Sequence, residues 1–395
     1  MSNASTPADT STPAGLRRPI GVAVIGCGTV GRIRAGIARD YPAVGWLGLC
    51  DRDEPLGRKL AGDTRADLFT TDAAALIARP EVDAVIVATD ENQHEIPTTL
   101  AARAGKALFI EKPLATTAVG SQRILTEITS AGVDAVVGYT QRFRRRFLAT
   151  KARLESGTIG AVTTVVTRAF MNQMVPLATL RRTAERATLT PIVVSGTHSV
   201  DMCMWLMAGK EPVSVYARSV DRSLGRHGTK DATLAIVTMA DGTIWSMNIS
   251  WALPTVWPGS VYGLEIGIVG THGVIDIEDT HRDLVLASDF PQPAGYQPEG
   301  FAAGAARHVD FLTSYPPGDL WNGQLWGPMR EETVSWLTRL INGGRTPHAT
   351  VADGHRNLLL TMAMDLSAAR RTEIDLPADP AELDTLLGTS GKERA

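Results

Sequence analysis

Short apolar runs alternate with amphipathic stretches from Ile20 to about Tyr139. Apolar runs of strand length that alternate with helical periodicity are typical of a parallel sheet covered by helices, the doubly wound α/β fold. The predicted strands are Pro19–Ile25, Gly45–Cys50, Ala84–Ala88, Ala107–Ile110 and Asp134–Gly138, and the predicted helices are Val30–Arg39, His94–Ala104 and Thr117–Ala131.

The pattern changes beyond Tyr139. A helix over Phe143–Ser156, a strand over Val162–Ala169, an irregular loop and a helix over Ser195–Ala208 precede a strand-rich region. Asp241-Gly242 lies between two of these strands and is a hairpin signal. This half therefore predicts an α+β domain with a large, mainly antiparallel open sheet. Its strands are Pro212–Ser219, Ala232–Ala240, Thr243–Ala252, Tyr262–Val269 and Gly273–Glu278, and helices near Gly327–Ile341 and Asp353–Arg370 follow.

These patterns divide the chain into five parts. Residues 1–17 are rich in Ser, Thr, Pro and Ala and predict a disordered tail. The α/β domain spans 18–140, the α+β domain 141–345, a C-terminal helix and closing segment 346–376, and a second tail 377–395.

The composition narrows the class of protein. Hydrophobic residues make up 44% and charged residues 21%, as in ordinary globular proteins, and the net charge of -3 gives no basic surface for nucleic acid or membranes. The longest apolar runs are too short to span a bilayer. Cys27, Cys50 and Cys203 form no CxxC pair, and no HExxH motif is present. We expect a cytoplasmic protein with no metal site and no nucleic-acid or membrane partner.

A glycine-rich turn joins the first predicted strand to the first predicted helix. Gly26 suits the tight turn, Gly28 lets backbone approach a pyrophosphate, and Gly31 allows close helix packing. Thr29 and Val30 open the helix, whose free N–H groups favour a bound phosphate. The motif predicts a dinucleotide-binding Rossmann domain.

The residues after the second strand bear on which dinucleotide binds. Asp51 follows Gly31 by 20 residues, where an acidic side chain binds the ribose hydroxyls of NAD. Its carboxylate would repel the 2′-phosphate of NADP, whereas Arg52 beside it can accommodate that phosphate. The sequence therefore favours NAD and leaves NADP as an alternative.

Glu111-Lys112-Pro113 ends the strand Ala107–Ile110, at the sheet edge where ligands bind in this architecture. Lys112 can hydrogen-bond the reacting oxygen of a substrate, or form an ordinary surface ion pair at a strand end. Further motifs follow in order: Ala88-Thr89 with His94, Ala102-x-Ala104-Gly105-Lys106, Arg142-Phe143, Gly157-Thr158-Ile159-Gly160, Gly196-x-His198-x-x-Asp201-x-x-x-Trp205-Leu206, Gly270-Thr271-x-Gly273, Arg345-x-Pro347 and Asp353-Gly354.

Over about residues 20 to 376 this ordered set resembles the Gfo/Idh/MocA family, the glucose-fructose oxidoreductase and inositol dehydrogenase type of enzyme. The resemblance implies hydride transfer between NAD and a sugar, polyol, cyclic diol or related small polar molecule. It implies a homodimer or homotetramer formed through the open sheet, and a Lys112–Pro113 bond that can be cis. It makes Lys112 and His198 the catalytic pair, places Arg142 at the substrate, and puts Thr89, His94, Glu111 and Pro113 around the nicotinamide.

His198 has a second argument from its position. Ser195-Gly196-Thr197 offers a helix start, so His198 lies in the first turn, where the positive helix end lowers an imidazole pKa. Asp201, three residues on, shares its face and can orient the ring. The alternative is a structural histidine. Many family members carry an Asp four residues before this histidine, where this chain has Val194, and Asp90 stands where the family often has Pro.

The loop from Met171 to Thr190 bears on the substrate. It carries Arg181, Arg182 and Arg186 against one acid, Glu185, and Arg168 precedes it. Guanidinium groups bind carboxylates with paired donors, so Arg181 or Arg182 is predicted to hold an acidic substrate. Solvated arginines, or pairs with a neighbouring subunit, are the alternative.

Two functions fit these residues. The first is an NAD(P)-dependent dehydrogenase or reductase acting on CH–OH groups. The second is a catalytically inactive dinucleotide-binding regulatory protein of the same fold. Intact Lys112 and His198 favour the enzyme.

Overall fold

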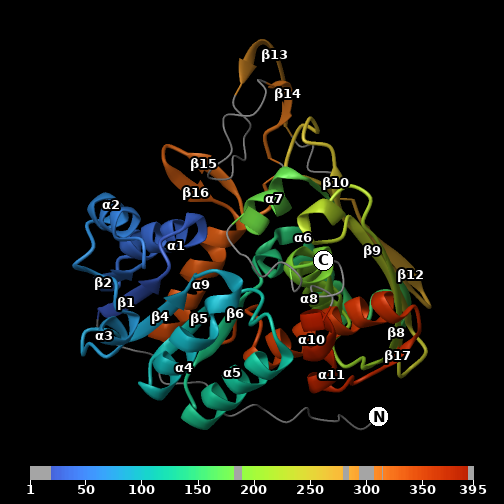
Figure 1. Cartoon of the computed structure of the whole chain (residues 1–395), viewed down its shortest axis with the longest axis horizontal. Helices are drawn as coiled ribbons and strands as arrows, with labels where there is room; N and C mark the ends of the chain where they lie inside the picture. The colour runs from blue at the N-terminus through green and yellow to red at the C-terminus, as the bar shows by residue number, and fades with distance from the viewer. Residues whose placement is uncertain (1–18, 182–188, 279–283, 293–306, 314, 390–395) are drawn as a thin grey trace.

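The computed structural model describes residues 19–181, 189–278, 284–292, 307–313 and 315–389. The predicted tail 1–17 lies outside this range. The two large sheets stand side by side, each with its own helices (Figure 1), and β13-β14 and β15-β16 form two small ones. Among the described helices, none is long and apolar enough to cross a membrane.

The first sheet confirms the predicted Rossmann fold. Its six parallel strands have the order β3-β2-β1-β4-β5-β6, so the order in which strands are added to the sheet reverses between β1 and β4. The elements α2, β3 and α3 were not predicted; β3 has only three residues, all half-buried, and α3 has five, too few for a clear pattern. The elements are β1 Ile20–Ile25, α1 Thr29–Asp40, β2 Val44–Cys50, α2 Glu54–Thr64, β3 Leu68–Thr70, α3 Ala73–Ile77, β4 Ala84–Val87, η1 Glu91–Gln93, α4 Glu95–Arg103, β5 Ala107–Glu111, α5 Ala118–Ala131 and β6 Ala135–Gly138.

The second sheet is mixed and mainly antiparallel, as predicted. Its order is β12-β11-β7-β10-β9-β8-β17, and β7 and β10 form its parallel pair. Its elements, with the connections before it, are η2 Thr140–Phe143, α6 Arg145–Glu155, β7 Val162–Asn172, α7 Met174–Arg181, η3 Pro191–Gly196, α8 Thr197–Leu206, β8 Pro212–Val220, η4 Gly225–His227, β9 Ala232–Met239, β10 Ile244–Leu253, β11 Val261–Gly270 and β12 Gly273–Ile277.

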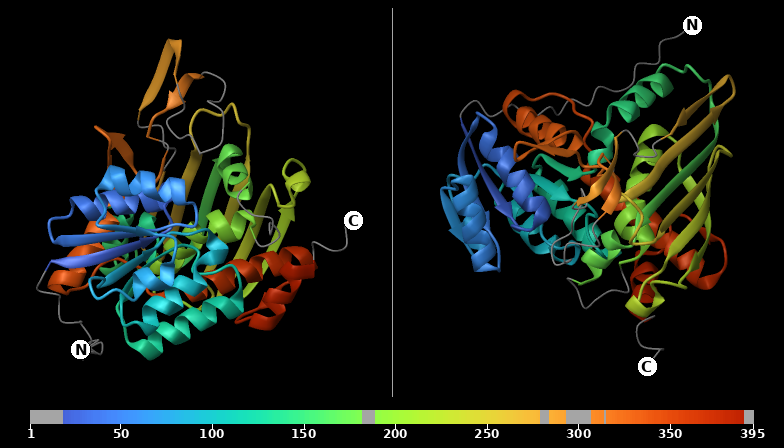
Figure 2. Two further views of the ribbon diagram at one scale, coloured as in Figure 1. Left: turned by 60° about the vertical axis from the view of Figure 1, so that its left-hand side comes forward. Right: turned by 90° about the horizontal axis from the view of Figure 1, so that it is seen from above.

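One face of this sheet packs against α8 and α10 (Val351–Arg370), which lie between the two sheets (Figure 2). Trp245 and Trp251 point into this layer and are fully buried, as the strand alternation predicts. Their indole N–H groups donate to Thr167 Oγ1 and Ser195 Oγ at 3.0 and 2.8 Å. The layer thus fixes the start of α8 against β10.

The last part of the chain departs from the predicted boundaries. Helix α9 (Pro328–Asn342) falls within the range 141–345 that was predicted for the α+β domain. It nevertheless packs Trp336 and Leu337 into the core of the Rossmann sheet. Residues 377–395 were expected to be a tail, yet α11 (Pro380–Thr389) buries Leu383. Its Asp384 carboxylate accepts the N–H groups of Ala118 and Val119 at 2.6 and 2.9 Å and so caps α5. The remaining strands are β13 Val285–Gln292, β14 Arg307–Phe311, β15 Asp319–Trp321, β16 Gln324–Trp326 and β17 Ile374–Asp375.

Candidate active site

A cavity of about 640 Å³ opens at the carboxyl ends of β1, β4 and β5. The glycine turn and Asp51 line one end, and Glu111 and Lys112 line the other. In open parallel sheets this is where ligands bind, beside the point at which the strand order reverses. The cavity therefore joins the predicted cofactor residues to the predicted catalytic lysine.

The glycine turn has the geometry that the motif predicts. Gly26 has φ +99°, a conformation that side chains disfavour, and a Cβ there would lie 2.4 Å from the carbonyl oxygen of Ala88. A Cβ on Gly31 would lie 1.8 Å from the carbonyl oxygen of Gly26, so α1 approaches the turn closely. Gly28, Thr29 and Val30 line the cavity where α1 begins, and the first turn of α1 carries no acidic residue. The start of α1 therefore has the features that suit a bound phosphate.

Asp51 supports the turn as well as lining the cavity. Its Oδ2 accepts the Cys27 N–H at 2.6 Å and its Oδ1 accepts the Asp53 N–H at 2.9 Å. The exposed guanidinium of Arg52 lies 3.2 Å from Asp90 Oδ2. Arg52 is therefore paired with a carboxylate, which weakens the case for a 2′-phosphate there.

The strand ends beside Lys112 are tied together by His94, which is 1% exposed. Its Nδ1 lies 2.8 Å from the Pro113 carbonyl oxygen, and its Nε2 lies 3.2 Å from that of Thr89. The Lys112–Pro113 peptide bond is cis. Thr89 Oγ1 is enclosed and has no hydrogen-bond partner among the described residues. An unpartnered donor at this cavity, together with the open phosphate turn, fits a dinucleotide with its nicotinamide near Lys112.

Lys112 contacts the backbone of Val194, the residue that stands where many family members carry an aspartate. The Lys112 ammonium donates to the carbonyl oxygen of Val194 at 3.2 Å. Val194 belongs to η3, a single π-helical turn that leads directly into α8, and π turns recur at functional sites. Thr190 caps this turn by accepting the Val193 N–H at 3.2 Å. A neutral carbonyl thus holds the lysine.

His198 lies in the first turn of α8 and is half-buried. Burial and, to a lesser extent, the nearby charge of Lys112 hold the pKa of His198 well below its usual 6.5. The lowered pKa agrees with the prediction, but its cause is burial and Lys112, whereas the prediction named the helix end. Its Nδ1 is enclosed without a partner among the described residues. The ring packs at 90° against Tyr139, with ring centroids 6.2 Å apart, and the Tyr139 hydroxyl hydrogen-bonds Thr197 Oγ1 at 2.8 Å.

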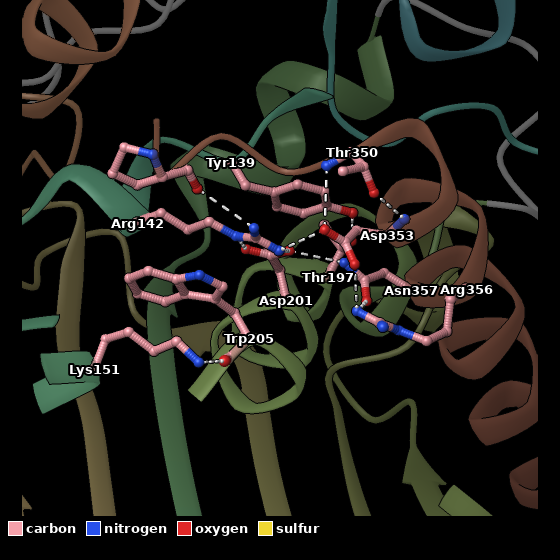
Figure 3. A network of polar contacts seen from close by, with 11 residues as sticks. Tyr139, Arg142, Lys151, Thr197, Asp201, Trp205, Thr350, Asp353, Arg356 and Asn357 are labelled. Carbon is pink, nitrogen blue, oxygen red and sulfur yellow. Dashed lines mark hydrogen bonds and ion pairs between the residues drawn. The ribbon is translucent and has the colours of Figure 1, made fainter. Parts of the chain in front are cut away.

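Asp201 and Arg142 pair with each other, and not with the partners expected from the sequence. Arg142 Nε and Nη2 donate to the two Asp201 oxygens at 2.8 and 2.6 Å, and both residues are buried (Figure 3). Asn357 donates to Asp201 Oδ1 at 2.9 Å, and Asp353 Oδ2 lies 3.3 Å from Arg142 Nη2. The guanidinium attracts Asp201 more strongly than a neutral imidazole does, so Asp201 is bonded to Arg142, while His198 Nδ1 has no partner among the described residues.

The arginines proposed for an acidic substrate are only partly described. Arg182, Glu185 and Arg186 lie outside the described residues, as does the side chain of Arg181 at the end of α7. Arg168 pairs with Glu265 on the adjacent strand at 2.5 Å and stacks on Phe170 and Tyr262. The guanidinium of Arg168 is therefore held within the second sheet by Glu265 and the two aromatic rings.

Several residues of the site were missed by sequence reasoning. Tyr139 directly follows β6, and its place at a parallel strand end was a usable signal. Arg34 is a charged residue on the buried side of α1, which was a second signal. Asn357 and Glu332 gave none, because each meets its partner from a distant helix.

Comparison with known proteins agrees with this geometry. An oxidoreductase family with an NAD-binding Rossmann fold matches residues 20–139, and the GFO/IDH/MocA C-terminal domain matches residues 147–276. Inositol 2-dehydrogenase of Acidothermus cellulolyticus is 28% identical over 378 residues, which cover 93% of this chain and 98% of that protein. Inositol 2-dehydrogenase of Gluconacetobacter diazotrophicus is 33% identical over 269 residues, 66% of this chain and 74% of that protein. Scyllo-inositol dehydrogenase from Lactobacillus casei, solved with NAD(H) and scyllo-inositol, shares the fold with a TM-score of 0.71 at 17% identity, covering 91% of this chain and 100% of that chain.

The Arg142–Asp201 pair predicts a specific pattern of stability. Asp201→Ala leaves a buried guanidinium without its main partner and should lower the free energy of unfolding by about 3–5 kcal/mol. The double variant Arg142→Met/Asp201→Leu removes both charges and should lose distinctly less. Urea unfolding measures both, and Glu54→Ala, which breaks the exposed pair with Arg58, serves as control with a change of about 0–1 kcal/mol. A double variant as unstable as Asp201→Ala would contradict this account.

Proposed function

Since this chain belongs to the GFO/IDH/MocA oxidoreductase family and is an NAD-dependent enzyme acting on CH–OH groups, we propose that Lys112 and His198 are its catalytic pair. One observation carries the proposal: Lys112, at the end of the cofactor cavity, donates to the carbonyl oxygen of Val194 at 3.2 Å, in the turn that leads directly to His198 at the start of α8. The cavity supplies the dinucleotide site, and the two side chains supply the groups that a hydroxyl or carbonyl carbon needs.

The roles of the two side chains follow from their surroundings. NAD, when bound, supplies the hydride acceptor or donor. Lys112, held by the Val194 carbonyl, donates a hydrogen bond to the reacting oxygen of the substrate. His198 is neutral at pH 7 because its pKa is low, so it can accept the hydroxyl proton during oxidation and return it during reduction. Tyr139 and Thr197 position the imidazole.

The substrate is a small polar molecule of the sugar, polyol or cyclic diol class. The relatives named inositol 2-dehydrogenase support this class. Val194 has no carboxylate, unlike the aspartate that many family members carry there, so one acceptor for substrate hydroxyls is absent and inositol itself is not assigned. A carboxylated substrate held by Arg181 or Arg182 stays a prediction.

The outer face of the second sheet is proposed as a contact between copies of this chain. Val166 on β7 is 52% exposed, and Leu234 and Ile236 on β9 are 54% and 51% exposed. Ile244 lies on β10, the strand between β7 and β9, and is 48% exposed. Apolar residues gathered on one sheet face indicate an interaction surface. A homodimer or homotetramer through this face would cover them.

The first prediction of the proposed function concerns the proton. Because His198 must be neutral to act as base, kcat/KM for alcohol oxidation should stay level from about pH 6.5 upward and fall only at more acidic pH. His198→Gln should lower kcat by a factor on the order of 10²–10⁴. The exposed His272→Gln is the matched control and should keep both rate and profile.

Lys112→Met completes the same test. It should abolish turnover, leave NAD affinity within a few-fold, and raise the pKa of His198, as histidine NMR titration would show. Only part of the shift should be relieved, since burial persists. A Lys112→Met enzyme with normal turnover would refute the assigned pair.

The second prediction concerns the choice of cofactor. Asp51 at the cavity and the pairing of Arg52 with Asp90 predict that NAD binds at least about tenfold more tightly than NADP, one decade being about 1.4 kcal/mol. Calorimetric titration measures both affinities. Arg52→Ala should leave NADP affinity unchanged, and a marked loss of NADP binding would instead assign the 2′-phosphate to Arg52.

The third prediction concerns assembly. Ile236→Asp places a charge in the middle of the outer sheet face and should shift the protein to smaller species in light scattering coupled to size-exclusion chromatography. Val256→Asp, at a 78% exposed apolar position off the sheet face, is the control and should leave the mass unchanged. If the native protein is already a monomer, the proposed contact is wrong.

A further inference from the structure

A buried cluster of charge stands directly behind the cofactor cavity. Arg34 of α1 is fully buried, and its Nε donates to Glu111 Oε1 at 2.9 Å while its Nη2 donates to Glu332 Oε2 at 2.6 Å. Glu332 on α9 is also fully buried, and Glu111 is 8% exposed where it lines the cavity. Two carboxylates therefore share one guanidinium inside the protein, where α1 and α9 lie side by side (Figure 1).

One carboxylate oxygen of this cluster, Glu332 Oε1, accepts no hydrogen bond from the described residues. Thr140 Oγ1 donates to Glu332 Oε2 at 2.8 Å, and Arg34 Nη1 is occupied by Thr333 Oγ1 at 2.6 Å. Glu332 Oε1 is enclosed and has no partner among the described residues. With both carboxylates ionised, the cluster would hold a net negative charge with an unsatisfied oxygen, which is unfavourable in a buried site. One proton on the cluster removes that charge.

The groups that face Glu332 agree with this count. Burial raises the pKa of Glu332 to about 7; Arg34 opposes the rise and Glu111 adds to it. His348 Nε2 contacts the Glu332 backbone carbonyl at 3.0 Å, and burial lowers the pKa of that ring to about 3, so it is neutral. Further charged groups lie around Glu332. They are Lys112 at the cavity, Arg142 and Arg339 near His348, and, on α9 itself, Arg330 and the exposed Glu331.

We propose that Arg34, Glu111 and Glu332 form a proton-holding cluster that responds to the charge of the nicotinamide: it releases a proton to solvent when oxidised NAD binds and keeps it beside reduced NAD. The oxidised ring is a cation and the reduced ring is neutral, so a positive charge beside Glu111 favours full ionisation of the two carboxylates. Only a carboxyl O–H bond breaks, and the proton passes to the buffer. The inference rests on the proposed place of the nicotinamide beside Glu111 and Lys112.

The sign of the pH dependence follows. Above the pKa of Glu332 the cluster is already ionised and attracts the cation; below it the cluster is neutral and does not. The affinity for oxidised NAD should therefore rise several-fold, up to about tenfold for one linked proton per pH unit, between pH 6 and pH 8. The affinity for reduced NAD should stay nearly level, so Glu332 sets the preference between the two redox states.

Isothermal titration calorimetry tests this with the whole protein and without turnover. Oxidised and reduced NAD are each titrated at pH 7 in phosphate and in Tris, whose different ionisation enthalpies report the protons exchanged. We expect a fraction of a proton to be released with oxidised NAD and little with reduced NAD. Glu332→Gln keeps the side-chain shape and should abolish the release and flatten the pH dependence, while the adjacent, exposed Glu331→Gln should change neither.

Two further variants keep the test decisive. Thr140→Val removes a donor to Glu332, so it should move the midpoint of the pH dependence upward even if Glu332→Gln does not fold. Asp365 is a second buried carboxyl whose pKa burial raises to about 7, but it accepts a hydrogen bond from Thr190 at 2.5 Å and makes none to the cluster, so Asp365→Asn should keep the proton release.

Proton release that survives in Glu332→Gln would assign it to another group, such as Lys112, and overturn the inference. So would the absence of release in the native protein, provided that oxidised NAD binds. Failure of both cofactors to bind would overturn the proposed site and the inference with it.

Discussion

The buried ion pair between Arg142 and Asp201 determines how the two halves of the site meet. Arg142 follows the last strand of the Rossmann sheet, and Asp201 lies one turn beyond His198 on α8. Both Asp201 oxygens are occupied by the guanidinium, and Asn357 of α10 adds a third donor. A buried pair repays its desolvation only with such complete hydrogen bonding. Its geometry then fixes the rotation of α8, and with it the direction of His198.

This pair also shows where sequence reasoning stops. The sequence alone places His198 and Asp201 on one helix, three residues apart. It does not show that Arg142 contacts Asp201, because these residues are 59 positions apart and their contact depends on the packing of two domains. The glycine turn was predictable in detail, because the positive φ of Gly26 and the contact of Gly31 are local requirements. Helix α11 was missed because one carboxylate, Asp384, and one buried leucine dock it, without a long periodic pattern.

The electrostatics of the pair Lys112 and His198 depend on the same arrangement. Val194 offers Lys112 a neutral carbonyl, so the ammonium charge is not cancelled at that contact. That charge and burial together disfavour a second cation on His198, which leaves the imidazole unprotonated near neutrality. A carboxylate at Val194 would offset the lysine and weaken this effect. The departure from the family pattern is therefore compatible with a histidine base.

Glu111 and Lys112 are neighbours in the chain, and their side chains belong to two different networks. Glu111 points back to Arg34 and, through it, to the buried Glu332, whereas Lys112 reaches forward to the π turn before His198. In the proposed site the first contact lies toward the cofactor and the second toward the substrate. Because the described residues of the two networks have no side chain in common, the proposed site can balance the charge of the nicotinamide and the proton of the substrate with separate groups. Cofactor preference and proton transfer can then be altered independently by substitutions in this one fold.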